Sequence, residues 1–533
     1  MNRLPKADYN RSSVAASAAV SLLYAAASIY NYYGFDVNLP VKIILFAIRG
    51  ILAFLLIMHI VIPLLPVITS RAFDAPQAKT DLWRTTLLFA VIWLPFLIIK
   101  YPAAVHPDTW QGIWQFRHEA ILDHQPPVFT VITGLSCKLL GNNAGIFVLA
   151  FIFYIMYCFA FGYAYTYISQ TGIIPIIRKI IFFLFVSSPF TLGYIGVVVK
   201  DCPFCAAAVL ITVLLLKLSR DKSLSTSQNI LLFSSCVVLY CSRQNGLHIL
   251  LAVILFYIIA VIRSRLEIRS LYFIIASLIF SALFSFALCR AFDVTKPANS
   301  AKEMLSVPFQ QTARYVRDHP DDISDEERDI IDSVLVYDTL ADRYDPRISD
   351  PVKEEYTGNK DALSSYITVW MKQFIRHPGT YLEAFWEQNR YLFSPVESAS
   401  NIAFFEDTVI FYEMEAKFSC EGSWMYEPIF DEINALKGVR GFIPAYCMTA
   451  MKLPFIWITS NVGICNLVIL LCWLLLLMRR DRRSSLIYYV PVLMIILISM
   501  AGPVIQGQPR YMLPSMYLMP LFLTEFLRPA QEA

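Results

Sequence analysis

The chain has 533 residues, of which 57% are hydrophobic and 16% are charged, and its formal net charge at pH 7 is +3. Soluble domains carry about 25% charged residues, so this composition, with a mean hydropathy of +0.54, excludes an ordinary soluble protein. Apolar runs of about 20 residues, enough to cross a hydrocarbon core of about 30 Å, recur and predict an all-α polytopic membrane protein. The basic residues lie in short loops between these runs, so the charge does not indicate nucleic-acid binding.

In chain order, we expect N-terminal accessory transmembrane helices in residues 1–83 and a transmembrane core in residues 84–290. An extracytoplasmic domain, mixed but mainly helical, is expected in residues 291–444, and C-terminal transmembrane helices in residues 445–533. The predicted spans, about twelve in all, lie near 14–33, 41–65, 84–100, 144–168, 178–198, 202–218, 229–242, 246–263, 270–290, 459–478, 485–502 and 511–528.

Basic loops mark the cytoplasmic side of a membrane protein. The block Arg479-Arg480-Asp481-Arg482-Arg483 is the strongest such marker, and Arg71, Lys79 and Arg84 form another. This pattern predicts that both termini are cytoplasmic and that residues 101–143 form an outer loop.

The outer loop contains His106, His118 and His124, three of the seven histidines, together with Asp108 and Asp123. Trp110 and Trp114 are four residues apart, so they share one face of a short helix. The apolar segment from Pro126-Pro127 to Leu140 is short for a span and predicts a re-entrant or interfacial helix. We interpret this loop as an amphipathic segment that carries the chemistry; the alternative is a solvated loop with an aromatic interface anchor.

Further charged residues lie at the outer ends of the predicted helices. A charged side chain at the bilayer centre costs roughly 2.5–3.5 kcal/mol, so such residues are expected to pair or to line a wet cavity. We therefore predict a shared polar cavity at the outer leaflet, covered by the domain of residues 291–444. Its expected members are Asp108, Asp123, His124, Lys200, Asp201, Arg243 and Arg510.

Each of these residues also has a structural alternative. Lys200 and Arg243 would serve equally as snorkelling cations at helix ends. Asp201 is a suitable N-cap, Arg510 a partner for a carboxylate of the outer domain, and His124 a turn residue.

Metal sites have weaker support in the sequence. His106, Asp108, Asp123 and His124 offer ligands for a divalent ion, but their spacing matches no defined motif, so we assign no cofactor. Cys202 and Cys205 form a CxxC without a second pair and are not interpreted as a metal or redox site. His319-Pro320-Asp321 precedes a helix that Ser324 and Glu327 would cap, and we interpret it as a loop-to-helix transition without chemistry.

From about residue 84 onward, several short elements resemble the C-type glycosyltransferase (GT-C) superfamily, in particular a largely uncharacterised bacterial branch. These elements are His106-Pro-Asp108-Thr-Trp-Gln111, Asp123-His124-Gln-Pro-Pro127, Val199-Lys200-Asp201, Arg243-Gln-Asn-Gly246, Val307-Pro-Phe-Gln-Gln311-Thr-Ala-Arg314, Asp350-Pro-Val-Lys353 and Arg510-Tyr-Met-Leu-Pro514. Two departures stand out: two spans precede the acidic loop, and His124-Gln-Pro-Pro replaces the usual His-Pro-Pro.

The resemblance implies a multi-pass enzyme of the bacterial plasma membrane that transfers a sugar from a polyprenyl-phosphate donor to a glycan, lipid or protein acceptor. Asp108 is then the base, with Asp123 the runner-up, and inversion at the anomeric carbon is expected. Lys200, Arg243 and Arg510 would stabilise the leaving phosphate. His106, His124 and Asp201 would contact substrate, while Trp110, Trp114, Trp386 and Trp424 are candidates for stacking on sugar rings.

Two other functions fit the same composition. A transporter or flippase for polyprenyl-linked glycans would place ionisable groups near the bilayer midplane, often with internal symmetry. A polymerase or ligase of the O-antigen type shares the large outer loop and the basic grip on a lipid phosphate. A non-catalytic scaffold also remains open.

Overall fold

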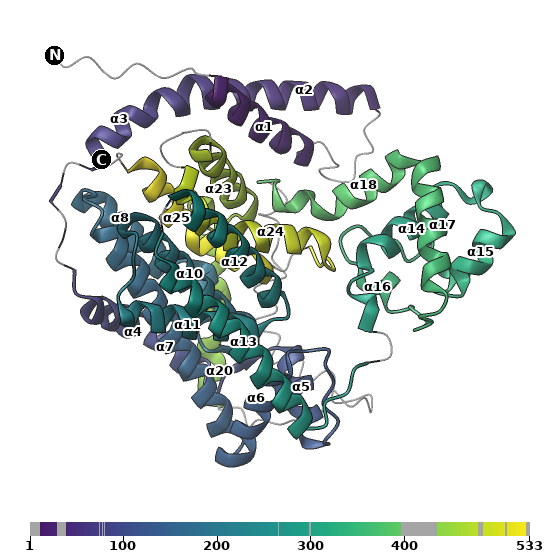
Figure 1. The fold of residues 1–533 in the computed structure, drawn as a ribbon, viewed down its shortest axis with the longest axis horizontal. Helices are drawn as coiled ribbons and strands as arrows, with labels where there is room; N and C mark the ends of the chain where they lie inside the picture. The colour runs from purple at the N-terminus through teal and green to yellow at the C-terminus, as the bar shows by residue number, and fades with distance from the viewer. Residues whose placement is uncertain are drawn as a thin grey trace.

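A computed structural model (Figure 1) describes residues 11–28, 39–264, 266–297, 300–395, 434–477, 483–506 and 509–528, apart from residues 74, 77 and 79. Within these ranges the chain is almost entirely helical. The only two strands in the described part, β1 (Ala104–Val105) and β2 (Val197–Val198), pair in parallel. The Arg479–Arg482 part of the basic block and Trp424 lie outside the described residues.

Seven helices are long and apolar enough to cross a membrane, which supports an all-α, multi-pass membrane protein. They are Pro40–Ala72, Leu82–Ile99, Asn142–Ser169, Pro175–Tyr194, Asp201–Asp221, Asn245–Arg263 and Ile268–Ala291. Shorter apolar helices cover Ser13–Ala27, Pro127–Leu140, Val462–Leu477 and Leu486–Ala501. The count of about twelve spans therefore stays a prediction.

The accessory region of the N-terminus contains α1 (Arg11–Ala27), α2 (Leu39–Leu56), the π-helical turn η1 (Ile57–Val61) and α3 (Ile62–Ala72). The last three form one continuous apolar helix. Ile43, Ile51 and Leu52 on α2 are more than half exposed, as expected for side chains that face lipid. α1 packs against α2 and against α23 (Val462–Leu477), and so joins the two ends of the chain.

Helix α10 (Asp201–Asp221) is the centre of the bundle, because nearly every one of its side chains is buried. A helix that is apolar all round has to be surrounded by other helices. α7 (Asn142–Ser169), α11 (Thr226–Ser242) and α25 (Leu513–Leu527) pack against it. Pro203 lies in its first turn, where the missing N–H has no intrahelical partner to lose.

The remaining helices of the bundle surround this centre. They are α4 (Leu82–Ile99), α5 (Pro107–Arg117), α6 (Pro127–Leu140), α8 (Pro175–Ser187), α9 (Pro189–Tyr194), α12 (Asn245–Ser264), α13 (Ile268–Ala291), α20 (Asn434–Arg440), α21 (Phe442–Ala450), α22 (Pro454–Thr459), η7 (Arg483–Tyr489), α24 (Val490–Ala501) and η8 (Pro509–Met512). The span expected at 178–198 is interrupted at Ser188, whose side chain accepts from the Thr191 N–H and caps α9.

Residues 300–395, which we call the polar domain, have a hydrophobic core of their own around Phe309, Ile331 and Tyr366. In Figure 1 this domain projects from one side of the bundle. Its helices are η2 (Ser300–Lys302), α14 (Ser306–Asp318), η3 (Pro320–Asp322), α15 (Asp325–Asp332), η4 (Tyr337–Thr339), α16 (Asp350–Lys353), α17 (Leu363–Arg376), α18 (Pro378–Asn389) and η5 (Arg390–Leu392). The Ser324 half of the predicted capping box is confirmed, since its side chain accepts from the Glu327 N–H at the start of α15. The Glu327 carboxylate pairs with Arg376 instead.

Backbone bonds attach the polar domain to the segment that follows α24. The Ser349 N–H donates to the Val504 carbonyl at 2.9 Å, and the Gln506 N–H donates to the Arg347 carbonyl at 2.7 Å. Ile348 and Ile505 form an antiparallel bridge between these two bonds. The domain is thereby fixed beside Arg510, four residues further along the chain.

Candidate functional site

A polar cavity of about 340 Å³ opens where α10 and α12 begin and α24 ends, with the polar domain forming the opposite wall. Its lining includes carboxylates, cations and amides, and one apolar side formed by Ile498, Pro503 and Ile505. The polar lining residues are Asp108, His124, Gln125, Lys200, Arg243, Gln244, Asn245, Glu303, Asp350, Lys353, Glu354, Ser499, Arg510 and Tyr511.

The two-stranded sheet brings the first two parts of the site together. Ala104 pairs with Val197 and Val105 with Val198, so the residues that follow each strand emerge side by side. β1 leads into α5, which begins with Pro107 and Asp108, and β2 leads through Lys200 into α10. The Thr109 hydroxyl donates to the Val198 carbonyl at 2.9 Å and locks this register.

Two glycines allow the close packing on which this arrangement depends. Gly196 adopts φ +76°, a left-handed conformation that suits glycine, and turns the chain from α9 into β2. Gly134 lets α5 approach α6, because a Cβ at that position would lie 2.1 Å from Cγ of Phe116.

Asp108 is the acidic group at the centre of the cluster. Its Oδ2 lies 3.0 Å from the Lys200 ammonium and 3.6 Å from Nη1 of Arg510. Lys200 also donates to Oε1 of Gln125. One carboxylate therefore meets two cations that come from distant parts of the chain.

His106 is the N-cap of α5 and lies beside Arg510. Its Nδ1 accepts from the Asp108 N–H at 3.1 Å, and its Nε2 lies 2.5 Å from Nη1 of Arg510. The Arg510 guanidinium also lies over the ring of Tyr511, 5.0 Å from its centroid. A neutral imidazole accepts at one ring nitrogen only, so His106 caps α5 through Nδ1 and lies in close contact with the Arg510 guanidinium.

A second ion pair lies next to the first. Arg243 bonds to Oδ1 of Asp201, whose side chain is fully buried, and stacks over Tyr511 at 4.7 Å from the ring centroid. Among the described residues, Oδ2 of Asp201 and Nε of Arg510 have no hydrogen-bond partner. Buried polar atoms normally find one. Arg510 lines the cavity and so has bonding capacity to spare beside it, whereas Asp201, a predicted member, does not line the cavity.

The charges set the protonation states of the outer-loop residues. Burial alone would raise the pKa of the Asp108 carboxyl, but Lys200, His106 and Arg510 outweigh it and hold the pKa well below its usual range. Burial, reinforced by Arg510, lowers the pKa of His106 to about 3. Burial also lowers the pKa of His124. Near neutral pH the site therefore presents an ionised carboxylate and neutral imidazoles.

The polar domain contributes a second group of charges to the cavity. Lys353 lies 2.8 Å from Glu303 and 2.9 Å from Asp350, and Lys302 lies 2.6 Å from Glu354. Burial opposes the charge on Lys353, yet the two carboxylates raise its pKa above the usual value. This wall is acidic overall, whereas the wall formed by the bundle carries Lys200, Arg243 and Arg510.

Several structural alternatives for these residues do not hold. The N-cap of α10 is Lys200, so Asp201 does not cap that helix and pairs with Arg243 instead. Arg510 pairs with Asp108 of the outer loop and not with a carboxylate of the polar domain among the described residues. Lys200 and Arg243 are both paired with carboxylates and do not simply extend towards water.

Other predicted members lie elsewhere. Asp123 does not line the cavity; its carboxylate accepts from Gln244 at 3.5 Å, and partial burial raises its pKa. Trp110 packs against the hydrophobic core, and Trp114 stacks on His118 at 4.2 Å between ring centroids. Trp386 donates to the Ala26 carbonyl of α1. None of these three tryptophans lines the described cavity.

The outer-loop metal alternative gains no geometric support. Across the described ranges, His106, Asp108, Asp123 and His124 do not form a group of three ligand atoms within 4.8 Å of one another. His106 and Asp108 approach each other as a pair only, at 3.7 Å.

Some lining residues were not among the predicted site. Gln125 and Tyr511 adjoin predicted members directly, so proximity in the sequence would have indicated them. Glu303 and Glu354 gave no such signal, because their place in the cavity depends on how the polar domain docks.

Comparison with known proteins gives a family but no function. Residues 42–533 match DUF6020, a family of unknown function, and the chain therefore belongs to that family. No curated protein and no solved structure matches the chain.

Proposed function

We propose that this member of the DUF6020 family is a membrane glycosyltransferase of the GT-C type. It would transfer a sugar from a polyprenyl-phosphate donor to a cell-envelope acceptor on the extracytoplasmic face of a bacterial plasma membrane. The observation that carries the proposal is the contact of Asp108 with Lys200 and Arg510 inside a polar cavity at one end of a membrane bundle.

The three cations of the cavity can stabilise the phosphate of the donor as it leaves. When the bond between the anomeric carbon and the phosphate oxygen breaks, negative charge develops on the phosphate, and fixed positive charges lower the barrier. Lys200, Arg243 and Arg510 line the same cavity, and an arginine can hold a phosphate through two parallel bonds. The apolar side is formed by Ile498 in the last turn of α24 and by Pro503 and Ile505 just after this helix. Leu497 of the same helix is exposed on the outside, and we place the lipid tail there.

Asp108 is placed to act as the base that deprotonates the acceptor hydroxyl. The acceptor hydroxyl attacks the anomeric carbon from the face opposite the phosphate, the phosphate leaves as an anion, and the hydroxyl proton passes to the Asp108 carboxylate. Its low pKa keeps this carboxylate ionised, and its base strength rises when the phosphate draws Lys200 and Arg510 away. Attack from the opposite face inverts the anomeric configuration. The acidic wall of Glu303, Asp350 and Glu354 then remains to bind acceptor hydroxyls.

The position of the cavity favours this reaction over transport. The site lies where α10 and α12 begin and α24 ends, so it is at the helix ends, whereas a transporter site is expected near the midplane.

The test is transfer by the purified protein in lipid vesicles, with a polyprenyl-phosphate hexose labelled in the sugar and a membrane glycan extract as acceptor. We expect labelled sugar in covalent linkage to the acceptor, release of polyprenyl monophosphate, and the inverted anomer by NMR. Movement of intact donor across the vesicle without a covalent product would favour the transporter. In a parallel assay with a polyprenyl-pyrophosphate oligosaccharide, transfer of the whole block with release of polyprenyl pyrophosphate would favour the polymerase or ligase.

A further inference from the structure

Two helices of the polar domain end in the same way and at the same place. α14 ends at Asp318 with His319 as its C-cap, and α17 ends at Arg376 with His377 as its C-cap. The two histidines have nearly equal backbone angles, φ −135° and ψ 53° against φ −133° and ψ 69°. A proline follows each histidine and begins the next helix.

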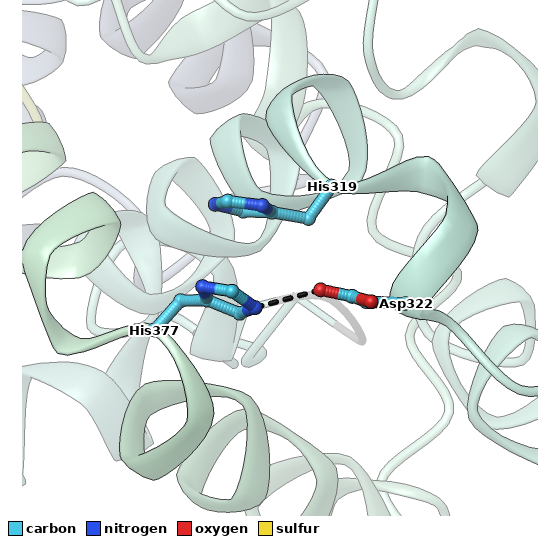
Figure 2. A group of neighbouring side chains, drawn as sticks. All are labelled: His319, Asp322 and His377. Carbon is cyan, nitrogen blue, oxygen red and sulfur yellow. Dashed lines mark hydrogen bonds and ion pairs between the residues drawn. The ribbon is translucent and has the colours of Figure 1, made fainter.

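The two histidine side chains meet a carboxylate (Figure 2). Their rings stack with 3.9 Å between centroids and 17° between planes. Nε2 of His377 lies 2.7 Å from Oδ2 of Asp322, in the turn η3 that follows His319. One ligand atom from each of the three residues lies within 4.8 Å of the others.

Neighbouring side chains contact both histidines. Nε2 of His319 bonds to the Thr380 hydroxyl at 2.8 Å, which leaves Nδ1 as its ligand atom. The Tyr315 ring packs against both imidazoles, at 5.2 Å and 5.6 Å between centroids. Metal-binding histidines usually bond through the second ring nitrogen in this manner.

The turn that carries Asp322 is held as well. Its carbonyl accepts from Nη1 of Arg376 at 2.5 Å. The charge of Arg376 is balanced by Glu327, 3.0 Å from Nη2, so it opposes a bound cation only weakly.

The electrostatics of this place favour a cation. The C-termini of α14 and α17 at the cluster each carry the equivalent of about half a negative charge, and the N-terminus of α18 offsets one of them. The Asp322 carboxylate adds a full negative charge. Imidazole combined with carboxylate suits zinc and related divalent ions, which often take three protein ligands and leave one position open.

We propose that His319, Asp322 and His377 bind a divalent transition-metal ion of the zinc class. The ligands are Nδ1 of His319, Nε2 of His377 and an Asp322 carboxylate oxygen, and solvent takes the fourth position, since Asp322 and His377 are partly exposed. An ion has to lie in the plane of each imidazole that binds it, so on binding the two rings rotate out of their parallel stack. The 2.7 Å contact between His377 and Asp322 opens towards the spacing of about 3.3 Å between ligand atoms of a tetrahedral site.

The ion would join the ends of α14 and α17 and the start of α18. α14 and α18 are already linked at their other turns, because Arg314 on α14 bonds to Glu383 and Glu387 on α18. None of the three ligand residues lines the described cavity, so this site is separate from the proposed transfer site.

Metal content of the full-length protein in detergent tests this site. After treatment with a chelator, the protein is titrated with zinc, and with cobalt as a visible probe of coordination. We expect the wild type to bind a single ion per chain and to unfold at a higher temperature with zinc present. Binding no stronger than that of a chelator-treated triple variant, H319F/D322N/H377F, would overturn the proposal.

Single variants identify the ligands. His377→Phe keeps the ring stack but removes the nitrogen, and we expect it to lose more zinc affinity than Thr380→Val, for which roughly 10–100-fold is typical of an orienting partner. Asp321→Asn changes an exposed neighbour outside the cluster and should bind zinc like the wild type. Equal affinity in His377→Phe and Asp321→Asn would overturn the proposal. If His377→Phe does not fold, the zinc affinity of Thr380→Val is compared with that of Asp321→Asn, and equal affinities would overturn the proposal.

Discussion

The Lys200 ammonium lies 3.0 Å from Oδ2 of Asp108, although α6, α7, α8 and α9 separate the two residues in the chain. The β1–β2 ladder brings about this contact, because it aligns the start of α5 with the start of α10. An acid held this way stays ionised but is a weak base until its cation is drawn elsewhere. We propose that the donor phosphate attracts the Lys200 cation and so frees the Asp108 carboxylate.

Asp108→Asn should abolish transfer while leaving the protein folded. The amide keeps the size of the side chain but cannot take a proton from the acceptor, so we expect kcat to fall by roughly 10²–10⁴-fold. The measurement is transfer of labelled sugar in vesicles, with unfolding temperature as a check on folding. The matched control is Glu119→Gln, an exposed acid on the same loop. Full activity in Asp108→Asn would remove Asp108 from the role of base.

His106 should make stability depend on pH. Its pKa is about 3 when folded and about 6.5 when unfolded. Between these values only the unfolded state binds the proton, so the stability from this group is complete above pH 6.5 and falls as pH drops. The slope is up to about 1.4 kcal/mol per pH unit.

Unfolding temperatures in detergent between about pH 4 and pH 7 measure this effect. We expect His106→Gln to have a shallower slope than the wild type. His118→Gln, at the exposed end of the same helix, should keep the slope of the wild type. Parallel slopes for all three proteins would show that His106 is not the group responsible.

The buried pair of Asp201 and Arg243 should be costly to break from either side. Removing one partner leaves an uncompensated charge, so Asp201→Ala and Arg243→Met should each destabilise the fold by roughly 3–5 kcal/mol. The double variant should cost less than the sum of the two, which unfolding measurements would show as a coupling energy.

A second pair on the same helix separates stability from function. Arg220 and Glu525 lie 3.5 Å apart at the other end of α10. Breaking the Arg220–Glu525 pair should lower stability without changing the KM for the donor. Loss of Arg243 should lower stability and also raise that KM. The same KM in both variants would exclude Arg243 from donor binding.

The sequence predicts the cation cluster well because short connections leave little freedom. Lys200 immediately precedes α10, and Arg243 lies between α11 and α12, so both must lie at the same end of the bundle. Asp123 was misplaced for the opposite reason. It belongs to a longer loop. The Asp123 N–H donates to the Thr295 carbonyl at 2.8 Å and the Thr295 N–H donates to the Ile121 carbonyl at 3.0 Å, which holds Asp123 beside the segment that leads into the polar domain.

The acidic wall of the cavity could not be predicted from one sequence. Glu303 and Glu354 belong to a domain with its own core, and hydrophobic patterning specifies that core but not where the domain docks. The docking depends on a few bonds between residues 347–349 and 504–506, which carry no recognisable pattern. The proposed metal site of His319, Asp322 and His377 could not be predicted for a similar reason, since its residues come from the ends of two helices that lie far apart in the sequence.

Lys100→Met should destabilise the fold and slow transfer without touching the cavity. Lys100 is buried at the end of α4 and donates to the carbonyls of Leu192 at 3.2 Å, Ile195 at 2.7 Å, and Gly193. These bonds hold the turn from α9 into β2, which leads to Lys200. Each buried carbonyl left without a donor costs about 1–3 kcal/mol, so we expect a loss of at least about 3 kcal/mol.

Thermal unfolding and transfer assays on the same preparations measure both effects of Lys100→Met. Lys138→Met, which changes an exposed lysine in the last turn of α6, controls for loss of a positive charge and should match the wild type in both assays. If Lys100→Met unfolds at the wild-type temperature, the three carbonyls do not depend on this ammonium. The register of β2 would then be maintained by the ladder with β1 and by the Thr109 hydroxyl alone.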